Sequence, residues 1–171
     1  MKHLIYLLRH AKSSWDEPEL ADRERPLAKR GRKAVALLRA HFEETGVAPD
    51  LVLCSSAVRA VQTLEGVREG LPAATRVEIE PGLYAAGAAS LLGRLRRLPE
   101  ELGSVMLVGH NPGLEDLAVE LAGPGEPDAR ASLEAKYPTG GLATLAFEGA
   151  WRELDWKGAT LEAFLVPRQL K

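Results

Sequence analysis

The chain has 171 residues, of which 46% are hydrophobic and 27% charged, a composition typical of one globular domain over residues 1–171. Its formal charge of −2 at pH 7 excludes a general nucleic-acid binder, because there is no excess of positive charge to neutralise many phosphates. The first apolar run, Leu4–Leu8, is too short for a signal peptide, and no stretch approaches the ~20 apolar residues of a membrane span. We therefore expect a soluble, cytoplasmic protein with no membrane partner.

Strand-like and helix-like segments alternate along most of the chain. We predict strands at 3–8, 51–54, 76–79 and 104–108, and helices at 27–45, 57–69, 88–98 and 113–122. Residues 16–26 and 123–130 have the composition of loops, and short strands are expected at 142–147, 152–156 and 162–166. This order predicts an α/β fold, a three-layer α/β/α sandwich whose mostly parallel sheet carries a C-terminal antiparallel extension.

Charged or polar residues follow three of the predicted strands at the point where each strand ends. The first strand runs into Arg9 and His10, the second leads to Arg59, and the fourth runs into His110. The carboxyl ends of parallel strands line the crevice where ligands bind in an open α/β sheet. The sequence therefore predicts a pocket of two histidines and two arginines, which suits an anion and above all a phosphoryl group.

Each of these residues has a chemical role available to it and an ordinary structural role besides. A histidine that attacks phosphorus must be neutral, and a neighbouring arginine disfavours the imidazolium form of His10. Arg59 lies one turn into a helix whose N-terminus attracts anions, with Ser55 or Ser56 as the expected N-cap. His110 can hold an oxygen on which charge builds during transfer. Considered alone, Arg9 and His10 could be a half-buried pair at a strand end, Arg59 a surface arginine and His110 a histidine in a loop. Their shared position at the ends of strands favours a functional role.

Other chemistries do not fit the spacing. Cysteine-dependent phosphatases use Cys-x5-Arg, but only four residues separate Cys54 from Arg59, so the lone cysteine is interpreted as a buried strand residue. There is no Gly-x4-Gly-Lys-Ser/Thr phosphate loop, and the four histidines show no paired ligand spacing, so we expect neither a metal nor a cofactor. Two basic runs, residues 29–33 and 94–97, are typical of solvated helix faces.

Three motifs resemble those of the histidine phosphatase superfamily, the phosphoglycerate mutase-like proteins. Leu8–Ala11 resembles the Arg-His-Gly signature with alanine in place of glycine, residues 55–63 resemble Ser-x-x-x-Arg-Ala-x-x-Thr, and Gly109–Pro112 resembles the motif of the second histidine. Three further segments resemble the small SixA-type branch of phosphohistidine phosphatases: Lys12–Trp15, Arg25–Leu27 and Pro138–Gly141.

The resemblance implies a metal-independent mechanism. His10 would attack phosphorus and become a phosphohistidine that water hydrolyses, while Arg9, Arg59 and His110 would hold the three non-bridging oxygens. Arg25 would complete the pocket, and Ser13 is counted with the residues that bind phosphate. The implied partner is a phosphorylated protein, with a histidine phosphotransfer domain as a family-level expectation, or a small phosphorylated substrate, and the protein is expected to be a monomer.

The sequence departs from the larger family members at two points. Ala85 stands where they carry a glutamate as general acid, and residues 80–104 leave no room for a lid. A general acid contributes typically ~100- to 10,000-fold, and its loss hurts alkyl phosphate esters most, because their leaving group needs a proton. Phosphohistidine or another phosphoramidate is therefore the favoured substrate. Candidate replacements for the acid are Asp16, Asp22, Glu115 and Asp116.

Two alternatives remain open at this point. A broad phosphomonoesterase for small metabolites would need the general acid that the sequence does not place. A non-catalytic module that binds phosphate or phosphohistidine would not need His10 intact, whereas both histidines and both arginines are present. A mutase is less favoured, since mutases of this superfamily need a closed site.

Overall fold

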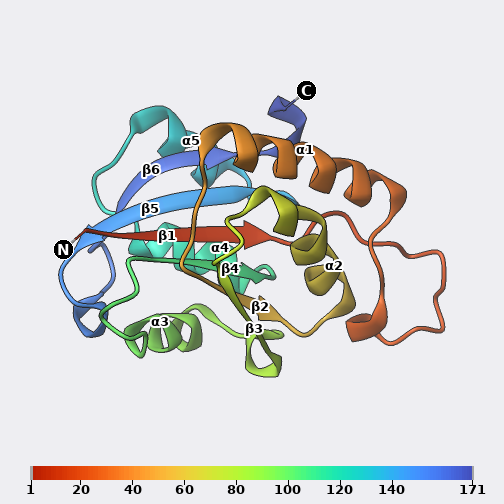
Figure 1. The fold of residues 1–171 in the computed structure, drawn as a ribbon, viewed down its shortest axis with the longest axis horizontal. Helices are drawn as coiled ribbons and strands as arrows, with labels where there is room; N and C mark the ends of the chain where they lie inside the picture. The colour runs from red at the N-terminus through yellow and green to blue at the C-terminus, as the bar shows by residue number, and fades with distance from the viewer. Residues whose placement is uncertain (1, 171) are drawn as a thin grey trace.

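The computed structural model describes residues 2–170 and contains one six-stranded sheet with helices on both faces (Figure 1). The spatial order of the strands is β3-β2-β4-β1-β5-β6. Their bounds are β1 Lys2–Arg9, β2 Leu51–Ser55, β3 Arg76–Glu80, β4 Ser104–Gly109, β5 Leu142–Glu148 and β6 Thr160–Leu165. Strands β1 to β4 pair in parallel, whereas β5 and β6 are antiparallel additions beside β1. The predicted fold class is confirmed.

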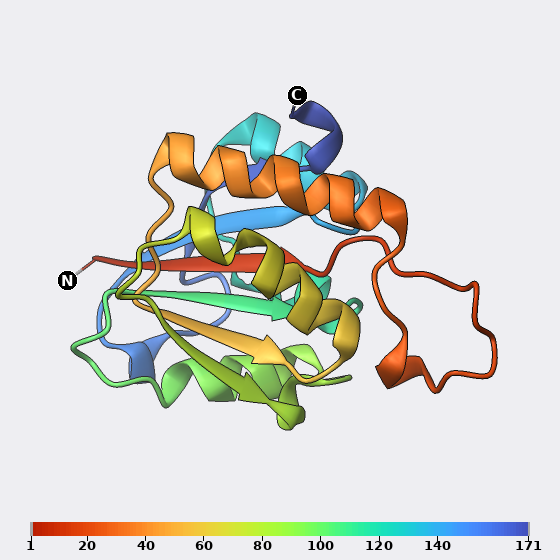
Figure 2. The same ribbon diagram turned by 45° about the vertical axis from the view of Figure 1, so that its right-hand side comes forward.

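The helices form the two outer layers. Their bounds are α1 Lys29–Thr45, α2 Val58–Val67, α3 Ala88–Arg96, α4 Gly113–Leu121 and α5 Pro127–Ala135, with short 3₁₀ turns at Asp22–Glu24, Arg68–Gly70, Pro81–Leu83, Trp151–Glu153 and Pro167–Gln169. Helices α1 and α2 cover one face of the sheet, while α3, α4 and α5 pack on the other (Figures 1 and 2).

Alternation along the central strands separates the two hydrophobic cores. In β1, Ile5 and Leu7 face the core shared with α3, α4 and α5, whereas Tyr6 and Leu8 face the core shared with α1 and α2. All four side chains are at least 93% buried. A central strand buried on both faces reads as a continuous apolar run, which is why β1 was recognisable in the sequence.

Parallel pairing brings the ends of three strands to one edge of the sheet. Arg9 at the end of β1 stands beside Gly109 at the end of β4, and Cys54 of β2 stands beside Val108 on the other side of β4. The segments that follow β1, β2 and β4 therefore leave the sheet next to one another, as the topology of an open α/β sheet requires.

Two predicted segments were wrong. Residues 123–130 were expected to be a loop, but α5 begins within them at Pro127, because the Glu126 carboxylate accepts the Ala129 N–H at 2.7 Å and caps the helix. The strand expected at 152–156 is a 3₁₀ turn followed by irregular chain, since the fully buried Trp151 indole donates to the Leu102 carbonyl at 2.8 Å and fixes the backbone there.

Within residues 2–170, no helix is long and apolar enough to cross a membrane. Residues 2–170 contain no inserted domain that covers the carboxyl edge of the sheet. The loop between β1 and α1 extends beyond this edge and is seen at the right of Figure 1. This loop carries the 3₁₀ turn Asp22–Glu24 and is held by a short antiparallel bridge between Ser13 and Leu27.

Candidate active site

His10 follows β1 directly and is 94% buried. Its Nδ1 lies 2.7 Å from the carbonyl oxygen of Ala11, which can only accept, so Nδ1 carries the hydrogen and Nε2 keeps a free lone pair. Burial, together with the charges of Arg59 and Arg9, lowers the pKa of His10 to about 3. The ring is therefore neutral at physiological pH, with its unprotonated nitrogen available to attack an electrophile.

Arg59 reaches the free nitrogen of His10 from the first turn of α2. Its Nε lies 3.4 Å from His10 Nε2, and its side chain is 93% buried. Thr63, one turn further along α2, accepts the Ala11 N–H at 3.0 Å and donates to the Arg59 carbonyl at 2.8 Å. This hydroxyl ties the start of α2 to the chain after β1 and fixes Arg59 relative to His10.

The Asp22 carboxylate occupies the outer side of the Arg59 guanidinium. Arg59 Nη2 lies 2.9 Å from Asp22 Oδ2, and Arg59 Nη1 donates to the Asp22 carbonyl at 2.6 Å. The Tyr84 hydroxyl donates to the same Oδ2 at 2.5 Å. These contacts, with a further one from Arg25, hold the pKa of Asp22 well below its usual range, so the carboxylate is ionised. Arg59, one of the two arginines predicted for the pocket, is thus already bound to an anion, the Asp22 carboxylate.

Arg25 and Ser13 form the support behind Asp22. Arg25 donates to Asp22 Oδ1 from Nε at 3.2 Å and from Nη2 at 3.1 Å, and from Nη1 to the Ser13 hydroxyl at 2.8 Å. Its guanidinium lies 3.6 Å from the centroid of the Trp15 ring. The two residues are therefore connected to His10 through Asp22 and Arg59, and no hydrogen bond joins their side chains to His10 in the described part of the chain.

Arg9 approaches the same place from the opposite side of the sheet edge. Its Nη1 donates to the Tyr137 carbonyl at 2.9 Å, an oxygen that also accepts from Asn111 Nδ2 at 3.0 Å. Its Nε is buried and has no hydrogen-bond partner within residues 2–170. Desolvation lowers the pKa of Arg9 from its ordinary value, but the group remains a cation.

His110 is held by Ser55, the last residue of β2. Its Nε2 lies 2.7 Å from the Ser55 hydroxyl, which also accepts the Ala57 N–H at 3.2 Å. Ala57 is the N-cap of α2 and makes no side-chain cap, so the expected capping by Ser55 or Ser56 was wrong; the Ser55 hydroxyl serves the histidine instead. The rings of His110 and His10 are 5.2 Å apart between centroids.

The protonation of His110 makes it a hydrogen-bond donor toward the site. Burial and the charge of Arg59 lower its pKa to about 4, so the ring is neutral. When the Ser55 hydroxyl gives its hydrogen to Nε2, the neutral ring carries its own hydrogen on Nδ1, which is buried and unpartnered among the described residues. His110 Nδ1 and Arg9 Nε are then two buried donors with no acceptor beside a neutral nucleophilic nitrogen, an arrangement that costs free energy until an oxyanion arrives.

The structure brings together the four residues that the three strand ends predicted. Arg59 Nε lies 3.4 Å from His10 Nε2, the rings of His10 and His110 are 5.2 Å apart between centroids, and the charge of Arg9 helps to lower the pKa of both histidines. Cys54 is fully buried and burial raises the pKa of its thiol to about 12, so it is a core residue as predicted.

Sequence reasoning missed the residues that reach the site from irregular chain. Tyr84 packs its ring 5.5 Å from that of His110, and Tyr137 orients Arg9 through its carbonyl. Asp22 was one of the four candidate acids, and it is the one that contacts Arg59. Ala85, which stands where larger family members carry the acid, has a left-handed φ of 59°. Of these residues, only Asp22 could have been found from its spacing in the sequence: Asp22 and Arg25 are three positions apart, and such a pair lies on one side of a turn.

The architecture and the site define the class of protein. A three-layer α/β/α fold with histidines and arginines gathered at the carboxyl edge of its parallel strands is that of a phosphatase. The family model described as the histidine phosphatase superfamily (branch 1) matches residues 5–106. The chain belongs to this superfamily.

Individual relatives agree with this assignment. The phosphohistidine phosphatase SixA of Escherichia coli is 32% identical over 124 residues, which cover 71% of this chain and 75% of that protein. The uncharacterized protein Rv1276c of Mycobacterium tuberculosis is 35% identical over 163 residues, 94% of this chain and all of the relative. Among solved structures, the SixA protein of Agrobacterium tumefaciens is 31% identical with a TM-score of 0.80, covering 96% of this chain and 98% of its own.

Proposed function

We propose that this protein is a metal-independent phosphatase that removes the phosphoryl group from phosphohistidine on another protein, through a covalent phosphohistidine at His10. The observation that carries the proposal is the neutral, buried His10 ring, whose Nε2 is unprotonated, in a site with two buried nitrogens, Arg9 Nε and His110 Nδ1, that have no hydrogen-bond partner within residues 2–170. Three phosphoryl oxygens match the donors of Arg9, His110 and Arg59, once the phosphoryl group takes the place of the Asp22 carboxylate.

The reaction has two displacements at phosphorus. The lone pair of His10 Nε2 forms a bond to phosphorus while the substrate's own N–P bond breaks. The substrate ring carries a proton on its other nitrogen, so it keeps the electron pair of the broken bond and departs as a neutral imidazole. Water then attacks the phosphohistidine, passes a proton to solvent, releases inorganic phosphate and restores Nε2. Arg9, Arg59 and His110 stabilise the oxygens during both steps, and removal of one such donor typically lowers the rate by about 10²–10³-fold.

The preference for phosphohistidine follows from the lack of a proton donor. Asp22 is the carboxylate that reaches Arg59, and its hydrogen bonds from Tyr84, Arg59 and Arg25 keep it ionised. An alkyl alcohol leaves phosphorus poorly without a proton, whereas an imidazole leaves readily. SixA of Escherichia coli, 32% identical to this chain, is named a phosphohistidine phosphatase, which supports the same substrate.

The test compares three substrates with an excess of metal chelator present. We expect turnover of a phosphohistidine protein, weaker turnover of p-nitrophenyl phosphate, whose leaving group needs no proton, and rates at least about 100-fold lower on glycerol phosphate. Equal rates on glycerol phosphate would instead mark a broad phosphomonoesterase. Loss of activity with chelator would overturn the metal-independent mechanism, and binding of phosphohistidine without any turnover would mark a recognition module.

A further inference from the structure

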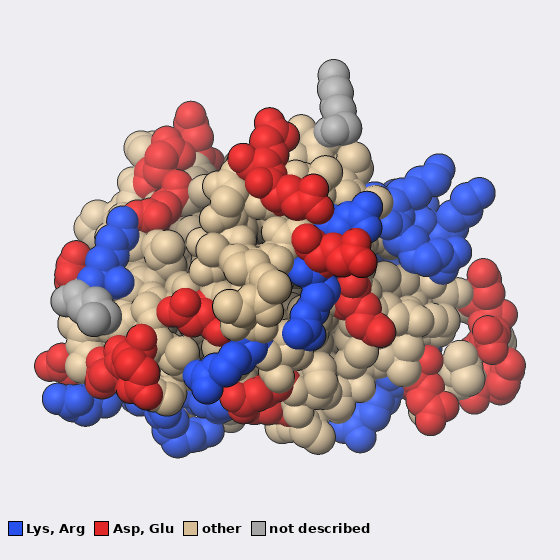
Figure 3. Space-filling model, in the orientation of Figure 1, with Lys and Arg blue, Asp and Glu red and all other residues tan. Residues whose placement is uncertain are grey.

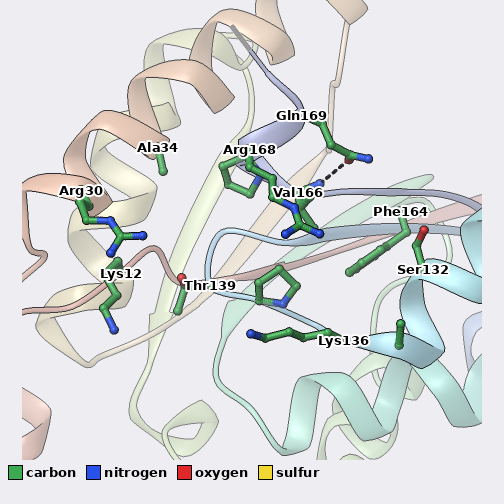
Figure 4. A pocket seen from close by; sticks show the side chains of 13 residues that line it. Lys12, Arg30, Ala34, Ser132, Lys136, Thr139, Phe164, Val166, Arg168 and Gln169 are labelled. Carbon is green, nitrogen blue, oxygen red and sulfur yellow. Dashed lines mark hydrogen bonds between the residues drawn. The ribbon is translucent and has the colours of Figure 1, made fainter.

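A second hollow lies next to the candidate site, between α1 and the end of the chain (Figure 4). It has a volume of about 370 Å³. Its walls are the first turns of α1, the end of α5, strand β6 and the turn Pro167–Gln169. No part of the proposed phosphatase mechanism uses it.

The hollow shares its wall with the backbone around His10. Lys12 lines it, two residues after the nucleophile, and the Lys12 carbonyl accepts the Ala28 N–H at 2.8 Å. Thr139 lines it too, and the next residue, Gly140, donates its N–H to the carbonyls of Arg9 and His10, each at 3.0 Å. The hollow is therefore bounded in part by the chain that follows His10 and by the chain that is hydrogen-bonded to its backbone, which places it near a protein bound at the candidate site.

The lining carries positive charge that nothing in the described chain neutralises. Among residues 2–170, four cations line it, namely Lys12, Arg30, Lys136 and Arg168, and no aspartate or glutamate does. Their side chains make no ion pair or hydrogen bond with any residue of 2–170, whereas Arg25 and Arg59 at the candidate site are paired with Asp22. In a chain of net charge −2 this is a local excess of positive charge, which favours an anionic partner.

The figures show the same concentration of charge. Figure 3 shows basic side chains gathered at the upper right over the N-terminal part of α1, which begins with the basic run 29–33. In Figure 4, Arg30 and Lys136 extend toward the hollow from opposite walls. The run at 29–33, which the sequence predicts to be a solvated face, thus contributes one residue to a basic hollow.

The geometry favours a protein surface over a small anion. All four cations are exposed and come from four separate segments around the rim, so no buried, preset donor defines a position for one ion. The remaining lining includes apolar groups, Ala34, Val166 and Phe164, the last packed edge-on against Tyr137 with ring centroids 4.9 Å apart. A lining that combines apolar side chains with exposed cations suits a segment that presents acidic side chains around apolar ones.

We infer that this basic hollow docks an acidic segment of the phosphoprotein whose phosphohistidine enters the His10 site. The inference rests on the proposed function, since a small phosphorylated metabolite would have no segment to dock. Rim charges of this kind mainly accelerate and orient association, so their loss should raise KM and leave the chemical step unchanged.

The experiment uses a charge reversal in the hollow with a matched control. The variant Arg30→Glu/Lys136→Glu changes two lining residues, and Lys33→Glu/Arg68→Glu makes the same change of charge at two exposed residues outside the hollow. The substrate is a histidine phosphotransfer domain with acidic residues around its phosphohistidine. For the hollow variant we expect kcat/KM to fall by about 10- to 100-fold through KM, with a weaker dependence on salt than in the wild type.

Turnover of p-nitrophenyl phosphate separates docking from chemistry. It should stay within about two-fold of the wild type in both variants, because neither changes a group at the phosphoryl site. Equal loss of phosphoprotein turnover in the two variants would overturn the inference, since total charge and not the hollow would then be responsible. Unchanged phosphoprotein kinetics in the hollow variant would overturn it as well.

A binding measurement distinguishes failure of this inference from failure of the proposed function. The probe is a fluorescein-labelled acidic peptide from the same domain, without phosphate, followed by anisotropy. If the wild type does not hydrolyse phosphohistidine, the proposed function fails; weaker peptide binding by the hollow variant than by the control would still support docking. Inorganic pyrophosphate that binds more tightly than the peptide, and only when Arg30 and Lys136 are intact, would show a small-anion site and overturn the inference.

Discussion

The two ends of β1 each hold a buried histidine, and the two are used in opposite ways. His3, at the beginning of the strand, is 99% buried with its ring 4.3 Å from Trp151 and 5.2 Å from Phe147 between centroids. Neither of its nitrogens has a hydrogen-bond partner within residues 2–170. His10, just past the other end, is 94% buried, but its Nδ1 bonds a carbonyl and its Nε2 faces Arg59.

Burial therefore does not distinguish a reactive histidine from a structural one. His3 lies among aromatic rings at the amino edge of the parallel strands, where no cation approaches it among its ring contacts. His10 lies at the carboxyl edge, where the chain after each parallel strand brings a polar group. Position along the strand sets the surroundings, and the surroundings set the chemistry.

The sharpest test of this contrast substitutes both histidines in turn. His10→Ala removes the nucleophile, and we expect activity toward p-nitrophenyl phosphate to fall by at least about 10⁴-fold, with no acid-labile phosphate retained on the protein. His3→Phe keeps the ring stacking and removes two unsatisfied nitrogens, so activity should stay the same while the free energy of unfolding rises by about 1 kcal/mol. Steady-state kinetics, phosphate labelling and urea unfolding measure these effects.

The pair also defines the outcomes that break the contrast. Residual covalent labelling in His10→Ala would place the nucleophile elsewhere. A large loss of activity in a stably folded His3→Phe would mean that the amino end of β1 has a chemical role that its aromatic contacts do not indicate.

Substitution of His110 tests whether a hydrogen-bond donor near the nucleophile stabilises the negative charge that develops on the phosphoryl oxygens. His110→Ala removes the unpartnered Nδ1 donor, and we expect kcat to fall by about 10²–10³-fold while covalent labelling of His10 remains detectable. His110→Asn, which retains an N–H donor, should recover part of the loss. Failure of both variants to label would show that His110 is needed to form the phosphohistidine and not only to stabilise its oxygens.

The carboxyl edge was predictable from the sequence because regular structure brings it together. Arg9, His10 and His110 sit within two residues of strand ends, so an open parallel sheet alone places them side by side. Arg59 follows from the same rule one helical turn later. Local pattern was sufficient wherever a strand or helix carried the residue.

The irregular segments were not predictable in this way. Asp22 and Tyr84 are 62 positions apart and meet at 2.5 Å because the loop after β1 folds back over the turn after β3. No periodicity encodes such a contact. Helix α5 was missed for a related reason, since its Pro- and Gly-rich approach has loop composition and its cap is a glutamate, which is not among the preferred N-cap residues.

Substitution of Asp22 should have a smaller effect. It tests how the ion pair between Asp22 and Arg59 affects the binding of phosphate. Asp22→Asn removes the charge that occupies Arg59 and leaves a side chain of nearly the same shape. We expect inorganic phosphate to inhibit about 3- to 10-fold more tightly, because the anion no longer displaces a carboxylate from the guanidinium. Product-inhibition kinetics measure this. A loss of turnover above about 100-fold would instead identify Asp22 as a proton donor or acceptor in the reaction.

The last test concerns stability in acid. The pKa of His10 in the folded protein is about 3 and that of His110 is about 4, both below the ordinary 6.5. At a pH between 4 and 6.5 the unfolded chain therefore binds more protons than the folded protein. Stability contributed by the two neutral rings is complete above pH 6.5 and declines as the pH falls toward 4, by up to about 1.4 kcal/mol per pH unit for each histidine. Urea unfolding at pH 7, 6 and 5 should therefore give a steep decline for the wild type and a shallower one for His10→Ala. An identical slope in the two proteins would mean that His10 is protonated at the same pH in the folded and unfolded chain, and the neutral nucleophile would then lose its electrostatic basis.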